Sequence, residues 1–229
     1  ISSRLSPSMN ERLPIIVANH KANLNRERLS SWIKEVSEPA RSFGGVVILC
    51  PSMPFISSAS QQIRENDVQI FLGVQDVSKL AEGDYTGEVA ASQVSDLVDY
   101  SIIGHSERRT HFKETDEDLE KKVANSKSAN LKVIFCVQDA NISIPSGADI
   151  VAYEPIFAIA SGNPDTEQNI KGATDKLRSR GSHKVLYGGS VSAANAADIM
   201  KVAQVDGFLI GASNSLDPQK FTQILEALK

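Results

Sequence analysis

The stretch VDYSIIGHSERR, residues 98–109, joins an apolar run to a turn and then to the beginning of a helix. Residues 98–103 are largely apolar, as expected of a strand buried on both faces in a parallel sheet. Gly104 allows the backbone to turn sharply, and Ser106 and Glu107 are typical of the first turn of a helix. The stretch therefore predicts one strand–turn–helix unit of an α/β protein, with His105 where the strand ends.

Further runs of the same kind recur along the chain, at residues 15–18, 46–50, 68–74, 133–137, 150–153, 184–187 and 208–210. Eight strands alternating with helices predict a closed (β/α)8 barrel, with an open doubly wound sheet as the alternative. The first run is not followed by a glycine-rich dinucleotide fingerprint, which disfavours that alternative. No linker divides the chain, so we expect a single barrel domain at residues 14–229 behind a ragged N-terminal tail at residues 1–13.

The segments between the runs mostly carry helical periodicity. One places apolar side chains on a single helix face, at Leu29, Trp32, Ile33 and Val36. Another, residues 221–228, repeats this spacing behind a predicted N-cap at Asp217 and a proline at the first helical position, Pro218. Only residues 138–149, QDANISIPSGAD, connect the fifth and sixth runs, and a standard helix with two loops barely fits there. We therefore expect the helix after the fifth strand to be shortened or missing.

The bulk composition limits the possible partners and the location. The chain has 229 residues and a formal net charge of −4, which argues against nucleic acid or an anionic membrane as a partner. No stretch approaches the roughly 20 apolar residues that span a bilayer, and residues 1–13 lack the apolar centre of a secretory signal. The two cysteines, Cys50 and Cys136, fit buried thiols better than a disulfide framework. These features predict a cytoplasmic protein.

Polar residues follow the first run, at the end of the barrel where active sites of this fold lie. Asn19 and Lys21 alternate in strand fashion, so both side chains should point to the same side. A lysine there can neutralise a substrate phosphate and the negative charge that develops on an oxygen during reaction. The competing interpretation is a solvated loop lysine.

His105 and Glu154 follow the fourth and sixth runs in the same way. His105 would face a helix N-terminus, whose partial positive charge disfavours a protonated imidazole. A neutral ring can donate a hydrogen bond to a carbonyl oxygen, and Glu107 can orient Lys21 through an ion pair. Glu154, followed by Pro155 and a small apolar segment suited to a lid, is a candidate general base. The alternatives are a structural histidine and a glutamate paired with a surface lysine.

Small residues follow the last two strands, reading Gly-Gly-Ser at residues 188–190 and Gly-Ala-Ser at residues 211–213. Small side chains let backbone N–H groups approach a ligand closely, although glycines are also ordinary turn residues. The loops after strands 7 and 8 commonly bind phosphate in barrels of this kind. The two loops together therefore predict a phosphate site.

The motifs at four strand ends, in their order and spacing, resemble those of the triosephosphate isomerase family. They are Asn-His-Lys at residues 19–21, Gly-His-Ser-Glu-Arg-Arg at 104–109, Tyr-Glu-Pro at 153–155 and Tyr-Gly-Gly-Ser at 187–190. The resemblance runs from the first strand to the last helix. It implies a TIM barrel that interconverts dihydroxyacetone phosphate and D-glyceraldehyde 3-phosphate, a reaction of glycolysis and gluconeogenesis, with no cofactor and no metal.

The resemblance also implies a role for each matched residue. Glu154 is the base that moves a proton between C1 and C2 through an enediolate, and His105 is the neutral electrophile that polarises the oxygens. Lys21 and Asn19 stabilise the enediolate. The supporting residues are Glu107 and Tyr187.

The implied phosphate ligands are the backbone N–H groups of Ala160, Ser190, Gly211 and Ala212. A lid that closes over them would exclude water. The sequence departs from the family's pattern in the lid and in the last phosphate loop, at Phe157, Ala160, Asn163 and Ala212. A Cβ keeps the N–H but restricts φ, so these changes put the rate in doubt more than the type of reaction.

The assembly is also implied by resemblance. Residues 83–88 resemble the loop after strand three that inserts a threonine, here Thr86, into a neighbouring subunit, which predicts a homodimer. The short connection after the fifth strand is similar to that of archaeal members of the family, which are tetramers. Loss of a covering helix should expose barrel surface that a second interface could bury.

Two other functions fit the same fold. One is a catalytically impaired phosphate-binding or scaffold protein, suggested by the lid and phosphate-loop changes. The other is a barrel isomerase acting on a larger sugar phosphate, which would need a roomier pocket than this lid segment suggests.

Overall fold

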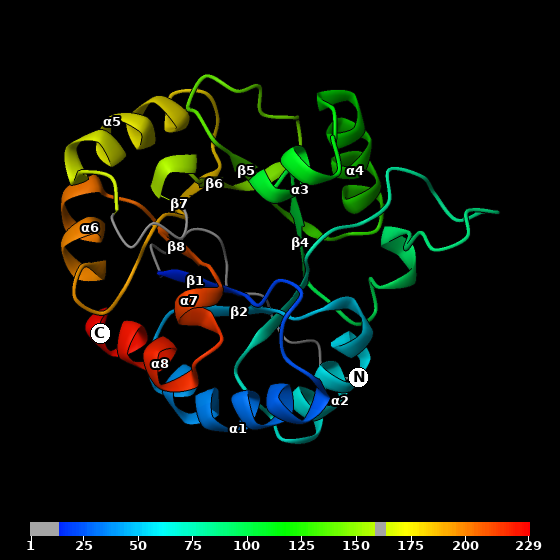
Figure 1. Cartoon of the computed structure of the whole chain (residues 1–229), viewed down its shortest axis with the longest axis horizontal. Coiled ribbons are helices and arrows are strands. Elements are labelled where there is room, and N and C mark those ends of the chain that lie inside the picture. The colour runs from blue at the N-terminus through cyan, green and yellow to red at the C-terminus, as the bar shows by residue number, and fades with distance from the viewer. Residues whose placement is uncertain (1–13, 159–163) are drawn as a thin grey trace.

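The computed structural model describes residues 14–158 and 164–229, and its eight parallel strands close into a barrel in sequence order (Figure 1). The predicted (β/α)8 barrel is confirmed. Residues 1–13, predicted to be a tail, lie outside the described residues. The strands are β1 (Ile15–Asn19), β2 (Val46–Cys50), β3 (Phe71–Val74), β4 (Tyr100–Ile103), β5 (Lys132–Val137), β6 (Ala148–Tyr153), β7 (Lys184–Tyr187) and β8 (Gly207–Ile210).

Helices surround the barrel on its outer side (Figure 1). The α-helices are α1 (Arg26–Ser42), α2 (Ile56–Glu65), α3 (Ser106–His111), α4 (Asp116–Ser128), α5 (Glu167–Arg178), α6 (Ala196–Ala203), α7 (Ala212–Ser215) and α8 (Pro218–Ala227). Short 3-10 turns are η1 (Met53–Phe55), η2 (Ala91–Gln93) and η3 (Ile156–Ala158). Among residues 14–158 and 164–229, no helix is both long enough and apolar enough to cross a membrane.

The helix signals read from the sequence hold in detail. The side chain of Asp217 accepts the backbone N–H groups of Gln219 and Lys220 at the start of α8, as an N-cap does. Helix α1 buries the predicted apolar face against the barrel, including Trp32. Its N-cap, Asn25, was not predicted, although asparagine is a preferred N-cap residue.

The connection between β5 and β6 contains no helix, as predicted, but the outer surface of the strands is still covered there. Ile142 and Ile144 of this connection pack against the main core. The exposed large apolar side chains of the described residues all lie elsewhere, at Tyr85, Phe112, Ile156, Phe157 and Val202. The expectation of exposed barrel surface here is therefore wrong, because two isoleucines of an extended loop cover the strands in place of a helix.

Strand alternation separates two cores, one inside the barrel and one between barrel and helices. On β1, Ile15 and Val17 belong to the inner core, and Ile16 and Ala18 to the outer one. The same alternation continues beyond the apolar run. It directs the next residue, Asn19, toward the barrel interior and the one after it toward the helices.

The two cysteines lie inside the barrel as free, fully buried thiols. Burial raises the pKa of both Cys50 and Cys136, which keeps the thiols protonated and unreactive. The predicted buried thiols are confirmed.

His20, the outward-facing residue of this strand end, is 1% exposed and meets Trp32 edge to face. Burial lowers the pKa of His20 to about 4, although a hydrogen bond with the Ser215 carbonyl partly opposes this. Between pH 6.5 and 4 the unfolded chain therefore binds a proton that the folded chain does not, so stability falls as the pH falls.

Replacing His20 with phenylalanine should reduce the pH dependence of stability. Lowering the pH from 7.5 to 5 should destabilise the wild type by about 2 kcal/mol more than the variant, from 1.36 kcal/mol per pKa unit. Urea unfolding at both pH values and one protein concentration measures this. An identical pH dependence of the two proteins would show that His20 titrates normally.

Candidate active site

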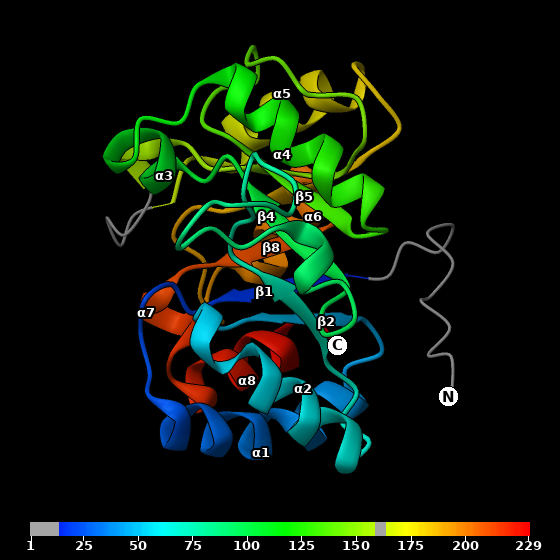
Figure 2. The same ribbon diagram turned by 90° about the vertical axis from the view of Figure 1, so that its right-hand side faces the viewer.

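The C-terminal ends of the strands surround a cavity of about 80 Å³. Figure 2 shows α3 and α7 at this same end of the barrel. Predicted residues from five separate strand ends line the cavity: Asn19, Lys21, His105, Glu154, Ser190, Gly211 and Ala212. Ala160, the remaining predicted phosphate ligand, lies outside the described residues.

Lys21 is held in a left-handed backbone conformation, with φ of +52°. Such a conformation is costly for a residue with a Cβ and persists only where neighbours enforce it. Here the side chain of Asn19 accepts the Lys21 N–H at 3.1 Å, and Ser52 and Gln75 donate to its carbonyl at 2.8 and 2.9 Å. The strained turn brings the lysine side chain back over the cavity.

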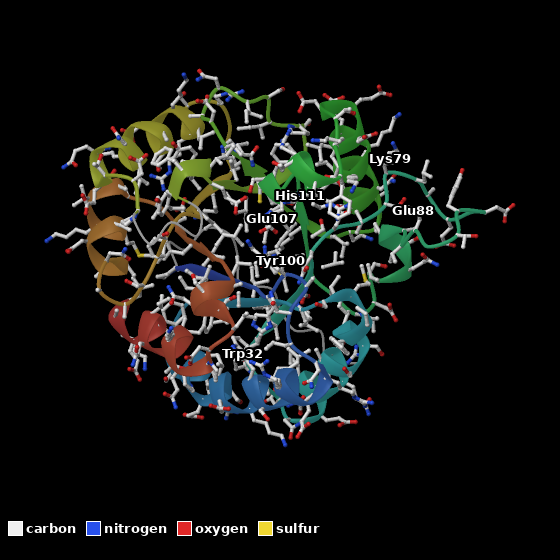
Figure 3. All side chains as sticks on the ribbon, viewed as in Figure 1. Trp32, Lys79, Glu88, Tyr100, Glu107 and His111 are labelled. Atoms are coloured by element: carbon white, nitrogen blue, oxygen red, sulfur yellow. The ribbon has the colours of Figure 1, made fainter. Side chains whose placement is uncertain are left out.

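The Lys21 ammonium donates to the Glu107 carboxylate on α3, so the ion pair expected from the sequence is present. Figure 3 shows Glu107 over the middle of the barrel. The connection between β4 and α3 depends on Gly104, whose φ of +76° would strain any other residue. This turn brings His105 into the cavity as the N-cap of α3.

His105 and Glu154 are in direct contact, with 3.1 Å between the imidazole Nε2 and the carboxylate Oε1. Both side chains are buried, at 7% and 3% exposure. The other ring nitrogen, Nδ1, accepts the backbone N–H of Glu107 at 3.2 Å, which places the ring proton on Nε2.

The pKa of His105 is raised, whereas the position of the ring at a helix N-terminus predicted a lowered pKa. Burial lowers this pKa, but the charge of Glu154 and its hydrogen bond raise it by more, so the net pKa lies above 6.5. The sequence could not show this, because Glu154 lies 49 positions away and its contact with His105 depends on barrel closure.

Contacts of two residues with Glu154 were not predicted, although Gly188 belongs to the predicted phosphate loop. The buried thiol of Cys136, on β5, lies near Glu154, whose charge helps to raise the pKa of this thiol. Gly188 leaves room for the carboxylate, because a Cβ there would lie 2.6 Å from the Glu154 Cγ. Strand alternation on β5 could have identified Cys136 as inward-facing, whereas the role of Gly188 depends on a contact between loops.

Comparison with known proteins agrees with this geometry. The family model described as triosephosphate isomerase matches residues 14–148 and 141–228. The chain belongs to the triosephosphate isomerase family. The two matches overlap at residues 141–148, which comprise the second part of the helix-free connection between β5 and β6 and the first residue of β6.

Curated triosephosphate isomerases are similar over nearly the whole chain. The protein of Colwellia psychrerythraea is 31% identical, with 95% of this chain and 98% of the relative aligned. That of Leifsonia xyli subsp. xyli is 33% identical over the same shares of both chains. The protein of a Jannaschia species is 37% identical over 80% of this chain and 85% of the relative.

In this member of the triosephosphate isomerase family, the end of β7 and the loop after it hold both sides of the predicted lid. The Ser190 hydroxyl donates to the Ala158 carbonyl at 2.8 Å, at the first hinge of the lid. The Tyr187 hydroxyl accepts the Asp165 N–H at 2.9 Å, after the lid. Phe157, one of the departures from the family's pattern, is 66% exposed, and Asn163 lies outside the described residues.

Replacing Gly188 with alanine should lower kcat about 10- to 100-fold, because an added Cβ would displace the Glu154 side chain and misplacement by about 1 Å can cost 10²-fold. Steady-state kinetics would measure the loss. Gly172→Ala in α5 is the matched control, since nothing lies within 4 Å of its Cβ position. A Gly188→Ala protein as active as this control would show that the position of Glu154 is not critical.

Proposed function

We propose that this chain interconverts dihydroxyacetone phosphate and D-glyceraldehyde 3-phosphate by proton transfer through an enediolate. The observation that carries the proposal is the buried contact of 3.1 Å between Glu154 and His105, in a cavity that Lys21 also lines. A general base, an N–H donor and a cation thus converge where a small carbonyl compound can react.

Glu154 acts as the base. Its carboxylate removes a proton from the carbon next to the carbonyl group and returns it to the neighbouring carbon. The hydroxyl proton passes from one oxygen to the other through the Nε2 of His105, which gives its proton to the carbonyl oxygen and takes one from the hydroxyl oxygen, so no atom is lost or gained. The Nε2–H of His105 donates to the carbonyl oxygen and then to the enediolate oxygens. Because Nε2 and the Glu154 carboxylate are in contact without substrate, the two side chains have to move apart for a substrate to bind between them.

Lys21 supplies positive charge for the enediolate and the phosphate, and Asn19 fixes the lysine backbone. Glu107 orients the lysine through their ion pair. Because the backbone of Lys21 is strained and hydrogen-bonded on both sides, its position is set before substrate binds.

The phosphate is bound by the backbone N–H groups of Ala160, Ser190, Gly211 and Ala212. The small side chains at the last three positions line the cavity next to Lys21, which supports this placement. Tyr187 supports the site by holding the chain after the lid.

The small cavity favours a triose over a larger sugar phosphate. The impaired-scaffold alternative is not favoured by any observation on the described residues, since Asn19, Lys21, His105 and Glu154 lie together. A coupled assay with D-glyceraldehyde 3-phosphate tests the proposal. Turnover no faster than the uncatalysed reaction would contradict it.

We also propose a cytoplasmic homodimer formed through the Thr86 loop. The connection between β3 and η2 extends away from the barrel (Figure 1), and its base is closed by a hydrogen bond from the Ser78 N–H to the Val89 carbonyl. Tyr85 near its tip is 47% exposed. A long, closed and exposed loop of this kind suits insertion into a partner subunit.

Light scattering should give a mass near twice the 24.7 kDa of one chain, or four times for a tetramer. Tyr85→Asp should shift the protein toward the monomer, because a charge in a buried interface is costly. Val202→Asp, at an exposed apolar residue on α6, is the matched control. A wild-type protein of 24.7 kDa in solution would rule out the dimer.

A further inference from the structure

One backbone carbonyl, that of Ser215 at the end of α7, joins three parts of the structure. It accepts the indole N–H of Trp32 at 2.8 Å and lies 3.0 Å from the Nε2 of His20. Since a carbonyl can only accept, His20 is the donor and carries its proton on Nε2. The Ser215 hydroxyl donates in turn to the carbonyl of Asn19 at 3.1 Å.

These hydrogen bonds are shielded from solvent, and their geometry is fixed by packing. His20 and Trp32 are each 1% exposed and Ser215 is 0% exposed. The two rings meet edge to face, with their centroids 4.8 Å apart, so neither can turn without disturbing the other. Trp32 points from α1 toward the barrel (Figure 3). Both N–H groups are therefore aimed at one oxygen.

The carbonyl that they hold is linked to the cavity. Helix α7 has only four residues, and its first residue, Ala212, lines the cavity together with the preceding Gly211. The Ser215 N–H donates to the Gly211 carbonyl at 3.0 Å, which closes this single turn. Asn214 of the same turn donates to the Val191 carbonyl at 2.6 Å, in the loop after β7. A shift of Ser215 would therefore move both phosphate loops.

His20 is placed for this role by its position directly after β1. Strand alternation directs Asn19 into the cavity, and the strained turn returns Lys21 to it, while His20 between them faces the helices. The strand end that supplies the cationic group therefore also holds the loop that faces it across the cavity.

We propose that His20 and Trp32 are positioning residues that fix α7, so that the N–H groups of Gly211 and Ala212 meet the substrate phosphate at a set distance from Lys21. The identity of the phosphate compound rests on the proposed function. The positioning role goes beyond that function, because it is assigned to residues that do not touch the substrate.

The test compares His20→Phe, which keeps a ring but removes the N–H, with the wild type. Inorganic phosphate is the probe, as an inhibitor and in calorimetric titration. Losing one hydrogen bond to the Ser215 carbonyl should weaken phosphate binding about fivefold, corresponding to about 1 kcal/mol. KM for D-glyceraldehyde 3-phosphate should rise by a similar factor while kcat changes less. His20→Gln, which retains a donor, should restore part of the affinity.

Phe221→Leu provides the matched control, because Phe221 packs on Trp32 at 5.2 Å without donating to the carbonyl. It should lower Tm and leave phosphate affinity unchanged. If His20→Phe does not fold, Trp32→Phe, which removes the other N–H, is measured in the same way. A folded variant with wild-type phosphate affinity would overturn the proposal.

The outcomes separate this inference from the proposed function. If phosphate affinity falls in His20→Phe but the wild type does not turn over the triose phosphate, the positioning role stands and the isomerase function is rejected. If the wild type isomerises the triose phosphate but its phosphate affinity and KM do not depend on His20 or Trp32, the isomerase function stands and the positioning role is rejected.

Discussion

Replacing Glu154 with glutamine should lower kcat for D-glyceraldehyde 3-phosphate by about 10²- to 10⁴-fold, the contribution of a well-placed general base. The amide has nearly the shape of the carboxylate and keeps a polar group beside His105, but it cannot take up the proton from carbon. KM should change much less, because the phosphate loops are untouched. The coupled assay measures both constants.

A matched control separates loss of the base from damage to the fold. Glu120→Gln, at an exposed position on α4, makes the same chemical change and should keep full activity. Glu154→Asp keeps the carboxylate but withdraws it by one methylene, so its kcat should fall between those of the wild type and the glutamine variant. A wild type no faster than Glu154→Gln would reject the isomerase function.

The parts of the site that the sequence predicted are those set by local rules. The position of polar residues after apolar runs was enough to predict that Asn19, Lys21, His105 and Glu154 lie at one end of a barrel. Strand alternation explains the direction of Asn19, whereas a strained turn that was not predicted directs Lys21. The helix-free connection after β5 was predicted from its length alone. Each of these inferences needs only neighbouring residues and the closure of the sheet.

The parts that it missed depend on contacts between distant segments. Gln75 holds the carbonyl of Lys21 from 54 positions away, and Ser215 meets His20 from 195 positions away. The raised pKa of His105 has the same origin, because the nearby charge comes from another strand. A carboxamide or a serine in a loop carries no local mark of such a role.

A largely buried group of charges between α3 and α4 is another such long-range feature. The Lys122 ammonium, on α4, lies 2.6 Å from an oxygen of Asp76 and 2.6 Å from one of Glu114. Arg108 pairs with the same two carboxylates at 2.9 and 2.6 Å. Burial raises the pKa of Asp76 to about 6, although Lys122 and Arg108 both lower it. Asp76 begins the Thr86 loop and Arg108 belongs to α3, so these charges join the proposed dimer loop to the helix that carries Glu107.

Replacing Lys122 with methionine should destabilise the fold by about 3 kcal/mol at pH 8, because one arginine would then face two buried carboxylates. Removing the ammonium also removes a cause that lowers the pKa of Asp76, so this carboxyl should become neutral more readily in the folded variant. The folded variant then binds more protons than its unfolded chain as the pH falls. The loss of unfolding free energy relative to the wild type should therefore be smaller at pH 5 than at pH 8. Urea unfolding at both pH values measures this, and Lys121→Met, at a neighbouring lysine that is 54% exposed, is the control. A loss of unfolding free energy equal to that of the control would mean that packing rather than charge pairing holds the Thr86 loop against α3.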